Sequence, residues 1–182
     1  MTRGADSSTA RVICLHGPES VGKSVIGAQL ASRLDAELIH EYGRDYCDLH
    51  GTDLDMAGLI EIARVQTEWI AAARARAERF VIADTDALMT AVWADMMLGE
   101  RDPWFDGFTD TADLYLLLDI DLPFVDDGLR LYGSGEDRRR FFDLCRAELE
   151  RRGLRWALVS GSGEARLDNA LAAIASAFGA AG

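Results

Sequence analysis

Eight residues near the N-terminus form the motif G-x-x-x-x-G-K-S, which is typical of a loop that binds nucleotide phosphates. Lys23 in this motif is the only lysine of the chain, and every other one of the 19 basic residues is an arginine. A compact ammonium group fits a tight phosphate cradle better than a planar guanidinium does. The motif therefore predicts a bound nucleotide, with Lys23 on its phosphates and Ser24 on a Mg²⁺ ion. The residues predicted to bind the nucleotide are Gly17, Glu19, Ser20, Val21, Gly22, Lys23, Ser24 and Val25.

The residues around this motif have the pattern that such a loop requires. A short apolar run at 12–15, rich in β-branched side chains, precedes it and is typical of a buried strand. Apolar residues follow at helical spacing, namely Val25, Ile26, Leu30 and Leu34. A chance match in a glycine-bearing turn would lack this context of a strand before and a helix after.

A second set of candidate residues follows the apolar run at 80–83. Asp84 and Asp86 lie at the point where a buried strand would end, near the predicted Mg²⁺. Asp84 could hold the metal, and either carboxylate could accept a proton from a substrate hydroxyl. Alternatively, Asp86 caps the helix that follows.

A third set, Glu41, Tyr42, Arg44 and Tyr46, follows a predicted strand at 38–40. We expect one short turn here, with a carboxylate for sugar hydroxyls, aromatic rings that stack on a base, and an arginine for charge. The pattern alone is weak evidence, because Glu41 and Arg44 could form an exposed ion pair of under about 1 kcal/mol. The tyrosines could equally be packing residues at the edge of the domain.

Two later segments are candidates for closing over a substrate. Residues 126–140 contain three glycines and several arginines, so they suit a lid whose Arg130 neutralises charge on the transferred phosphoryl group. Alternatively, the arginines at 138–140 form the solvated face of a helix. A polar loop at 99–113 could supply Trp104 and Asp106 to a substrate pocket, or its aromatic residues could only attach the loop to the body of the domain.

The candidate residues depend on a repeated alternation of strands and helices. Further strands are predicted at 114–118 and 156–159, and helices at 56–77 and 87–98 and near the C-terminus. Strands that are apolar on both faces and separated by helices indicate an α/β sandwich of three layers around a parallel sheet. Ligands bind such sheets beyond the carboxyl ends of the strands, where the candidate residues lie. His16 and His40, which end the first two strands, are expected to be partly buried and not catalytic.

Composition restricts the class of protein. The 182 residues are 49% hydrophobic, so we expect one domain at 11–182 after a disordered tail at 1–10. A net charge of −12 would repel nucleic acids and anionic membranes, and no run is long enough to span a bilayer. The three cysteines lie far apart and suggest no disulfide. The first residues lack an apolar signal segment, so a cytoplasmic location is expected.

Taken together, the motifs resemble those of a known family. G-P-E-S-x-G-K-S at 17–24, E-Y-G-R at 41–44, D-T-D at 84–86 and V-D-D-G-L-R at 125–130 occur in the order found in the ribosylnicotinamide kinase domain of NadR-type NAD-biosynthesis proteins. The resemblance extends from about residue 12 to the last helix. It implies a P-loop kinase fold with a five-stranded parallel sheet and a mobile lid. It also implies ATP-dependent phosphorylation of nicotinamide riboside on its 5′-hydroxyl, giving nicotinamide mononucleotide.

The resemblance also suggests where the substrate binds. The riboside is expected near Glu41, Arg44 and Asp84, with Asp84 as the first choice for the base and Glu41 as the second. Longer members of the family carry an adenylyltransferase domain, and because this chain begins close to the loop strand, we expect it to stop at the mononucleotide. The sequence does not predict an oligomeric state.

Two other functions compete with this expectation. The first is a P-loop kinase for a different nucleoside, which would differ only in its base pocket. The second is a nucleotide-dependent switch or sensor. A GTPase is excluded, because its Asn-Lys-x-Asp motif would need an asparagine next to a lysine, and Asn169 and Lys23 are the only residues of these types.

Overall fold

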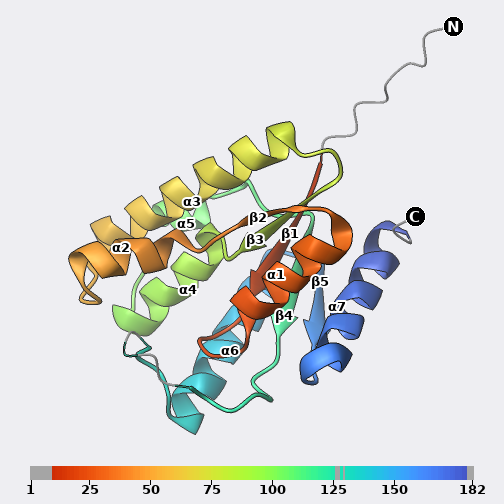
Figure 1. Ribbon diagram of the computed structural model, residues 1–182. Helices are drawn as coiled ribbons and strands as arrows, with labels where there is room; N and C mark the ends of the chain where they lie inside the picture. The colour runs from red at the N-terminus through yellow and green to blue at the C-terminus, as the bar shows by residue number, and fades with distance from the viewer. Residues whose placement is uncertain (1–9, 126–127, 129, 180–182) are drawn as a thin grey trace, which may run out of the picture.

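The computed structural model describes residues 10–125, 128 and 130–179. Strands and helices alternate along the chain (Figure 1) in the order β1 (Arg11–His16), α1 (Lys23–Leu34), β2 (Glu37–Ile39), α2 (Tyr42–His50), α3 (Met56–Arg76), β3 (Phe80–Asp84), α4 (Ala87–Met97), α5 (Pro103–Asp106), β4 (Leu114–Leu118), α6 (Gly135–Arg151), β5 (Trp156–Val159) and α7 (Gly163–Phe178). Residues 1–9 of the predicted tail lie outside the described residues, as do Asp126, Asp127 and Leu129 of the predicted lid.

The five strands form one parallel sheet in the order β2-β3-β1-β4-β5. The strand that precedes the phosphate-binding motif, β1, is therefore central, with β3 and β4 as its neighbours. Leu15 of β1 is paired with Asp84 of β3, and His16 is paired with Leu117 of β4. The carboxyl ends of the three central strands thus meet at one edge of the sheet. The predicted five-stranded parallel sheet is confirmed.

Alternate residues of each strand enter two separate cores, which explains why the strands are apolar throughout. Ile13 and Leu15 pack with residues of α1 and α7 on one face. Val12 and Cys14 pack with residues of α3, α4 and α6 on the other. Figure 1 shows α1 in front of the sheet and α6 behind it. The result is the predicted arrangement of three layers.

Side-chain caps fix the starts of four helices, one of which is α5, capped by Asp102. Asp55 accepts a hydrogen bond from the backbone N–H of Gly58 at 2.8 Å, which begins α3. Ser134 accepts one from the N–H of Asp137 at 3.0 Å, which begins α6, and Asp86 begins α4. Such caps satisfy N–H groups that have no partner within the helix. In the described part of the chain, no helix has both the length and the apolarity needed to cross a bilayer.

The structure differs from the sequence-based expectations in three segments. The short turn expected at 41–46 is the start of α2, a helix of nine residues. The polar loop at 99–113 contains a short helix, α5. The last residues of the predicted lid, 135–140, form the first turns of α6. The α2 segment was missed because a distant side chain, Gln66 of α3, binds its first N–H group, and local sequence patterns do not show such contacts.

Candidate active site

The phosphate-binding motif forms a tight loop between β1 and α1. Gly17 and Gly22 have φ values of 131° and 82°, which L side chains rarely adopt. A Cβ atom at Gly17 would lie 3.0 Å from the carbonyl oxygen of Leu118. Lys23 is the first residue of α1, and its Nζ donates hydrogen bonds to the carbonyl oxygens of Gly17 at 2.9 Å and Pro18 at 2.7 Å. The ammonium group therefore lies across the loop, where phosphate oxygens could replace the two carbonyl oxygens as its partners.

Ser24 and Asp84 meet beside this loop. The Ser24 hydroxyl donates a 2.6 Å hydrogen bond to Oδ2 of Asp84, which ends β3 and is 2% exposed. The other oxygen, Oδ1, is buried without a hydrogen-bond partner. A buried carboxylate oxygen of this kind needs a partner, and Mg²⁺ is typically held by one or two protein oxygens plus the phosphates of a substrate. The two side chains therefore fit a Mg²⁺ ion that arrives with a nucleotide.

Glu41 supplies a second carboxylate, directly after β2. Its Oε2 lies 3.9 Å from Nε of Arg44, and its side chain is 23% exposed. Burial raises the pKa of Glu41 to about 7, with the charge of Asp84 adding to the rise and Lys23 and Arg44 opposing it. A carboxyl group with such a pKa can accept and release a proton near neutral pH.

The phosphate-binding loop, from Glu19 to Val25, and Glu41 line one cavity of about 180 Å³. Asp84 is not among the lining residues and adjoins the cavity through its hydrogen bond to Ser24. The apolar and aromatic part of the lining comprises Leu54, Leu59, Ile62, Met89, Trp93 and Met97. The cavity therefore connects a phosphate site with a pocket suited to a planar ring.

Gln66, Thr85 and Trp93 are among the lining residues that were not predicted from the sequence. Gln66 is 2% exposed, accepts a hydrogen bond from the N–H of Tyr42 at 2.8 Å, and donates one to the carbonyl oxygen of Thr85 at 3.4 Å. Thr85 has a φ of 78°, a strained value for a β-branched residue and one that is often found at functional sites. Trp93 projects from α4. A glutamine on the buried face of a helix was the signal that could have identified Gln66.

The described residues of the predicted lid contact the phosphate-binding loop. Nη1 of Arg130 donates a hydrogen bond to Oγ of Ser20 at 3.2 Å and another to the carbonyl oxygen of Val125, and Arg130 lines the cavity. Arg138 instead binds the carbonyl oxygen of Leu122 at 2.9 Å and is not among the lining residues. Among the arginines of the predicted lid, Arg130 therefore lines the cavity, whereas those at 138–140 do not.

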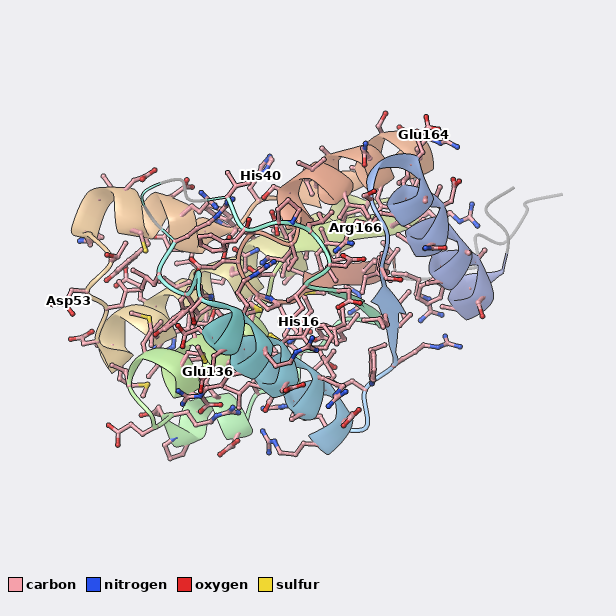
Figure 2. All side chains as sticks on the ribbon, turned by 90° about the horizontal axis from the view of Figure 1, so that it is seen from below. His16, His40, Asp53, Glu136, Glu164 and Arg166 are labelled. Carbon is pink, nitrogen blue, oxygen red and sulfur yellow. The ribbon has the colours of Figure 1, made fainter. Side chains whose placement is uncertain are left out.

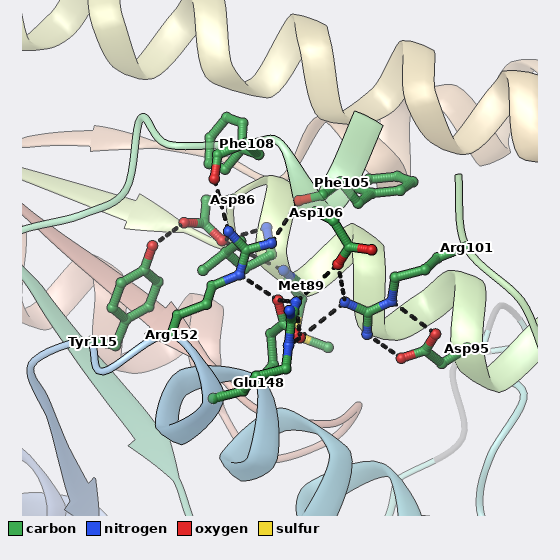
Figure 3. Close-up of polar contacts among 12 residues, drawn as sticks. Asp86, Met89, Asp95, Arg101, Phe105, Asp106, Phe108, Tyr115, Glu148 and Arg152 are labelled. Carbon is green, nitrogen blue, oxygen red and sulfur yellow. Dashed lines mark hydrogen bonds and ion pairs between the residues drawn. The ribbon is translucent and has the colours of Figure 1, made fainter. Parts of the chain in front are cut away.

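Six predicted substrate-binding residues are not in the cavity lining, and one of them, Asp84, adjoins the cavity through its hydrogen bond to Ser24. Asp86 is 3% exposed, caps α4 and accepts a 2.5 Å hydrogen bond from Tyr115, so the alternative of a helix cap is the one that the structure supports (Figure 3). Asp106 pairs with Arg151 at 3.0 Å, outside the cavity. The remaining three are aromatic residues that pack on other rings, namely Tyr42, Tyr46 and Trp104. Trp93 therefore replaces Trp104 as the aromatic side chain of the cavity.

His16 and His40 differ from the expectation that both are partly buried. His16 lies inside the molecule at 0% exposure, whereas His40 is exposed (Figure 2). Burial lowers the pKa of His16 to about 3, and the charge of Lys23 lowers it further, so the ring is neutral at pH 7. Neither histidine lines the cavity.

One residue of helix α7 contacts the phosphate-binding loop. Arg166 is 4% exposed, and its Nη2 donates hydrogen bonds to the carbonyl oxygens of Val21 at 3.1 Å and Asp119 at 2.8 Å. Its Nη1 pairs with Asp121 at 2.6 Å. The buried guanidinium therefore joins the phosphate-binding loop to the segment after β4.

Comparison with known proteins identifies similar chains. A family model described as AAA domain matches residues 12–166. The trifunctional NAD biosynthesis/regulator protein NadR of Escherichia coli K12 is 32% identical over 155 residues, which cover 82% of this chain and 38% of that protein. The chain thus spans less than half the length of this curated relative.

Solved structures show the same fold. A crystal structure of NadR protein in complex with NR has a TM-score of 0.78 and 23% identity, covering 94% of this chain and 52% of that one. Deoxyadenosine kinase from M. mycoides has a TM-score of 0.68 and 14% identity, covering 91% of this chain and 99% of that one. The fold is that of P-loop kinases.

Proposed function

The chain belongs to the AAA-domain family of P-loop proteins, and from this premise we propose that it is a kinase that phosphorylates nicotinamide riboside on its 5′-hydroxyl with ATP, yielding nicotinamide mononucleotide. The observation that carries the proposal is a cavity lined by the phosphate-binding loop, Glu41 and Trp93, beside which Asp84 accepts a hydrogen bond from Ser24 of the loop. Homology to NadR supports a nucleoside as the acceptor.

The phosphate end of the cavity would bind Mg-ATP. Backbone N–H groups of the loop and the ammonium of Lys23 would hold the triphosphate, and Ser24 and Asp84 would hold the metal. Mg²⁺ supplies neutralisation of phosphate charge when it is bound. Arg130 would add a second positive charge at the transferred group, since it already contacts Ser20 of the loop.

The acceptor end would bind the riboside. The pyridinium ring of nicotinamide riboside is cationic, so it would be stabilised by the face of Trp93 and by the negative charge of the cavity carboxylates. Glu41 is the better base, because Oδ2 of Asp84 is already bonded to Ser24, while the pKa of Glu41 is raised to about 7 by burial. Glu41 would therefore take the proton of the 5′-hydroxyl as the phosphoryl group is transferred.

Phosphorylation of another nucleoside is the second candidate. The fold is shared with deoxyadenosine kinase over nearly the whole of that enzyme. The two candidates would use the same loop and carboxylates and would differ in the ring that occupies the apolar end of the cavity.

The test is an ADP-release assay with Mg-ATP that compares nicotinamide riboside with a panel of ribonucleosides and deoxyribonucleosides. We expect strong turnover only with nicotinamide riboside, and a product with the mass of nicotinamide mononucleotide. Turnover with another nucleoside alone would refute nicotinamide riboside as the substrate but leave the kinase activity supported. A rate of ADP release that does not depend on any added nucleoside would refute the kinase activity and favour a nucleotide switch.

A further inference from the structure

Glu19 places a carboxylate inside the phosphate-binding loop, where negative charge is unfavourable. A carboxylate near a triphosphate repels it, and a phosphate cradle needs only the backbone N–H group of this position. The side chain must therefore have a different partner. In the structure it turns toward the segment that follows Arg130.

Two backbone N–H groups of that segment bind the Glu19 carboxylate. Oε2 accepts hydrogen bonds from the N–H of Leu131 at 3.1 Å and from the N–H of Tyr132 at 3.0 Å. The contact joins residues more than a hundred positions apart in the sequence. Hydrogen bonds to an ionised acceptor are about twice as strong as neutral ones.

Ser20, the next residue of the loop, binds Arg130 itself and the backbone that precedes it. Its hydroxyl oxygen accepts hydrogen bonds from the N–H of Val125 at 2.8 Å and from Nη1 of Arg130 at 3.2 Å. Glu19 and Ser20 thus hold the backbone on the two sides of Arg130.

Tyr132 also connects this contact with the acceptor end of the cavity. Its ring lies 5.7 Å from that of Trp93, which lines the cavity, and 5.9 Å from that of Phe141 in α6. The backbone that Glu19 holds is therefore fixed between the phosphate-binding loop and the apolar end of the cavity.

From these contacts we infer that Glu19 is a positioning residue, whose carboxylate holds the backbone of Leu131 and Tyr132 and thereby fixes Arg130 over the phosphate-binding loop. The inference rests on the proposed kinase function for its catalytic consequence. The contact itself forms without substrate.

The first test measures the contact without any substrate. Hydrogen exchange of the Leu131 and Tyr132 amides is followed by NMR in the wild type, Glu19→Ala, Glu19→Gln and the control Glu68→Ala, which removes an exposed carboxylate from α3. We expect exchange to rise about tenfold or more in Glu19→Ala and to stay at the wild-type rate in Glu68→Ala. Glu19→Gln keeps one acceptor oxygen, so its exchange rates should lie between those of the wild type and those of Glu19→Ala. Unchanged exchange in Glu19→Ala would overturn the inference, whether or not the protein is a kinase.

The second test is a double-mutant cycle with whichever nucleoside supports turnover. We expect Glu19→Ala to lower kcat about tenfold, with the KM for the nucleoside within about twofold of wild type, because the lost interaction acts on the transferred group. If Glu19 acts through Arg130, the same substitution should change kcat little in an Arg130→Ala background. Equal losses of kcat in both backgrounds would show that Glu19 acts by another route and would overturn the inference. Absence of turnover with every nucleoside would refute the proposed function and leave the exchange measurement to decide on Glu19.

Discussion

Replacement of Glu148 by glutamine should be among the most destabilising single changes outside the cavity. Its side chain in α6 is 2% exposed and accepts hydrogen bonds from Arg101 at 2.9 Å and Arg152 at 2.5 Å (Figure 3). It also accepts a hydrogen bond from Arg151 at 3.0 Å. Glu148→Gln would leave three guanidinium groups around a neutral amide. Breaking a buried ion pair in this way is strongly destabilising.

The magnitude follows from the pKa. Burial alone would raise the pKa of Glu148, but the hydrogen bonds from Arg151, Arg152 and Arg101 outweigh burial and lower it to about 2 from 4.5. This difference corresponds to about 3 kcal/mol of folding stability at neutral pH. For a chain of this length, such a loss lowers Tm by roughly 6–12 °C. Because the folded pKa is depressed, the contribution is complete above pH 4.5 and is lost as the pH falls toward 2.

The assay is urea unfolding at a series of pH values, with Glu150→Gln as the matched control. Glu150 lies in the same helix, but its side chain is 55% exposed and its Oε1 lies 3.8 Å from Nε of Arg146. We expect a loss of about 3 kcal/mol for Glu148→Gln at pH 7, shrinking below pH 4.5, and under about 0.5 kcal/mol for the control. A loss below about 1 kcal/mol at pH 7, or one that does not change with pH, would refute the reasoning from the arginine contacts.

Three further predictions concern the cavity. Lys23→Ala should abolish turnover while the protein stays folded, with the free energy of unfolding lowered by up to about 3 kcal/mol because Nζ loses its hydrogen bonds to the loop, as measured by the ADP assay and urea unfolding; normal turnover would show that Lys23 does not bind the phosphates. Asp84→Asn should lower kcat by about two orders of magnitude or more, and a wild-type kcat would show that Asp84 neither holds the metal nor acts as the base. For the wild type, kcat/KM should fall as the pH drops below about 7, since Glu41 must be ionised to accept a proton. Glu41→Gln should remove this dependence and lower kcat about a hundredfold, whereas an unchanged pH profile would exclude Glu41 as the base.

Sequence patterns predicted most of the fold because its strands are buried on both faces. The bounds of β4 and β5 agree with the predicted runs at 114–118 and 156–159. The order of the strands was not predictable, because which strands are neighbours depends on packing between distant segments. Helix α2 was missed for the same reason, since Gln66 from α3 binds its first N–H group.

The proposed metal-binding part of the candidate site was predictable, because a sequence motif and the end of a buried strand mark its residues. The motif and the position of Asp84 at a strand end predicted that Ser24 and Asp84 would be close, and the structure places their oxygens 2.6 Å apart. The aromatic wall was not predictable. Trp93 lies in a helix that is mostly buried, so its sequence does not show which face borders a cavity, whereas Trp104 in a polar loop was the more visible candidate.

Several features that cost stability lie at or beside this cavity, which is itself evidence for where ligands bind. Among the described residues, Ser20, Asp35 and Thr85 are the non-glycine residues with positive φ, and Asp35 is the C-cap of α1, where that conformation is common. The other two line the cavity or the loop that forms its end. Asp84, whose Oδ1 is unpaired, and Glu41, whose pKa is raised, lie beside and in the lining of the same cavity. Strain and unsatisfied charge persist in a folded protein where function requires them, so their coincidence supports the loop, Asp84 and Glu41 as the reacting part of the molecule independently of any relative.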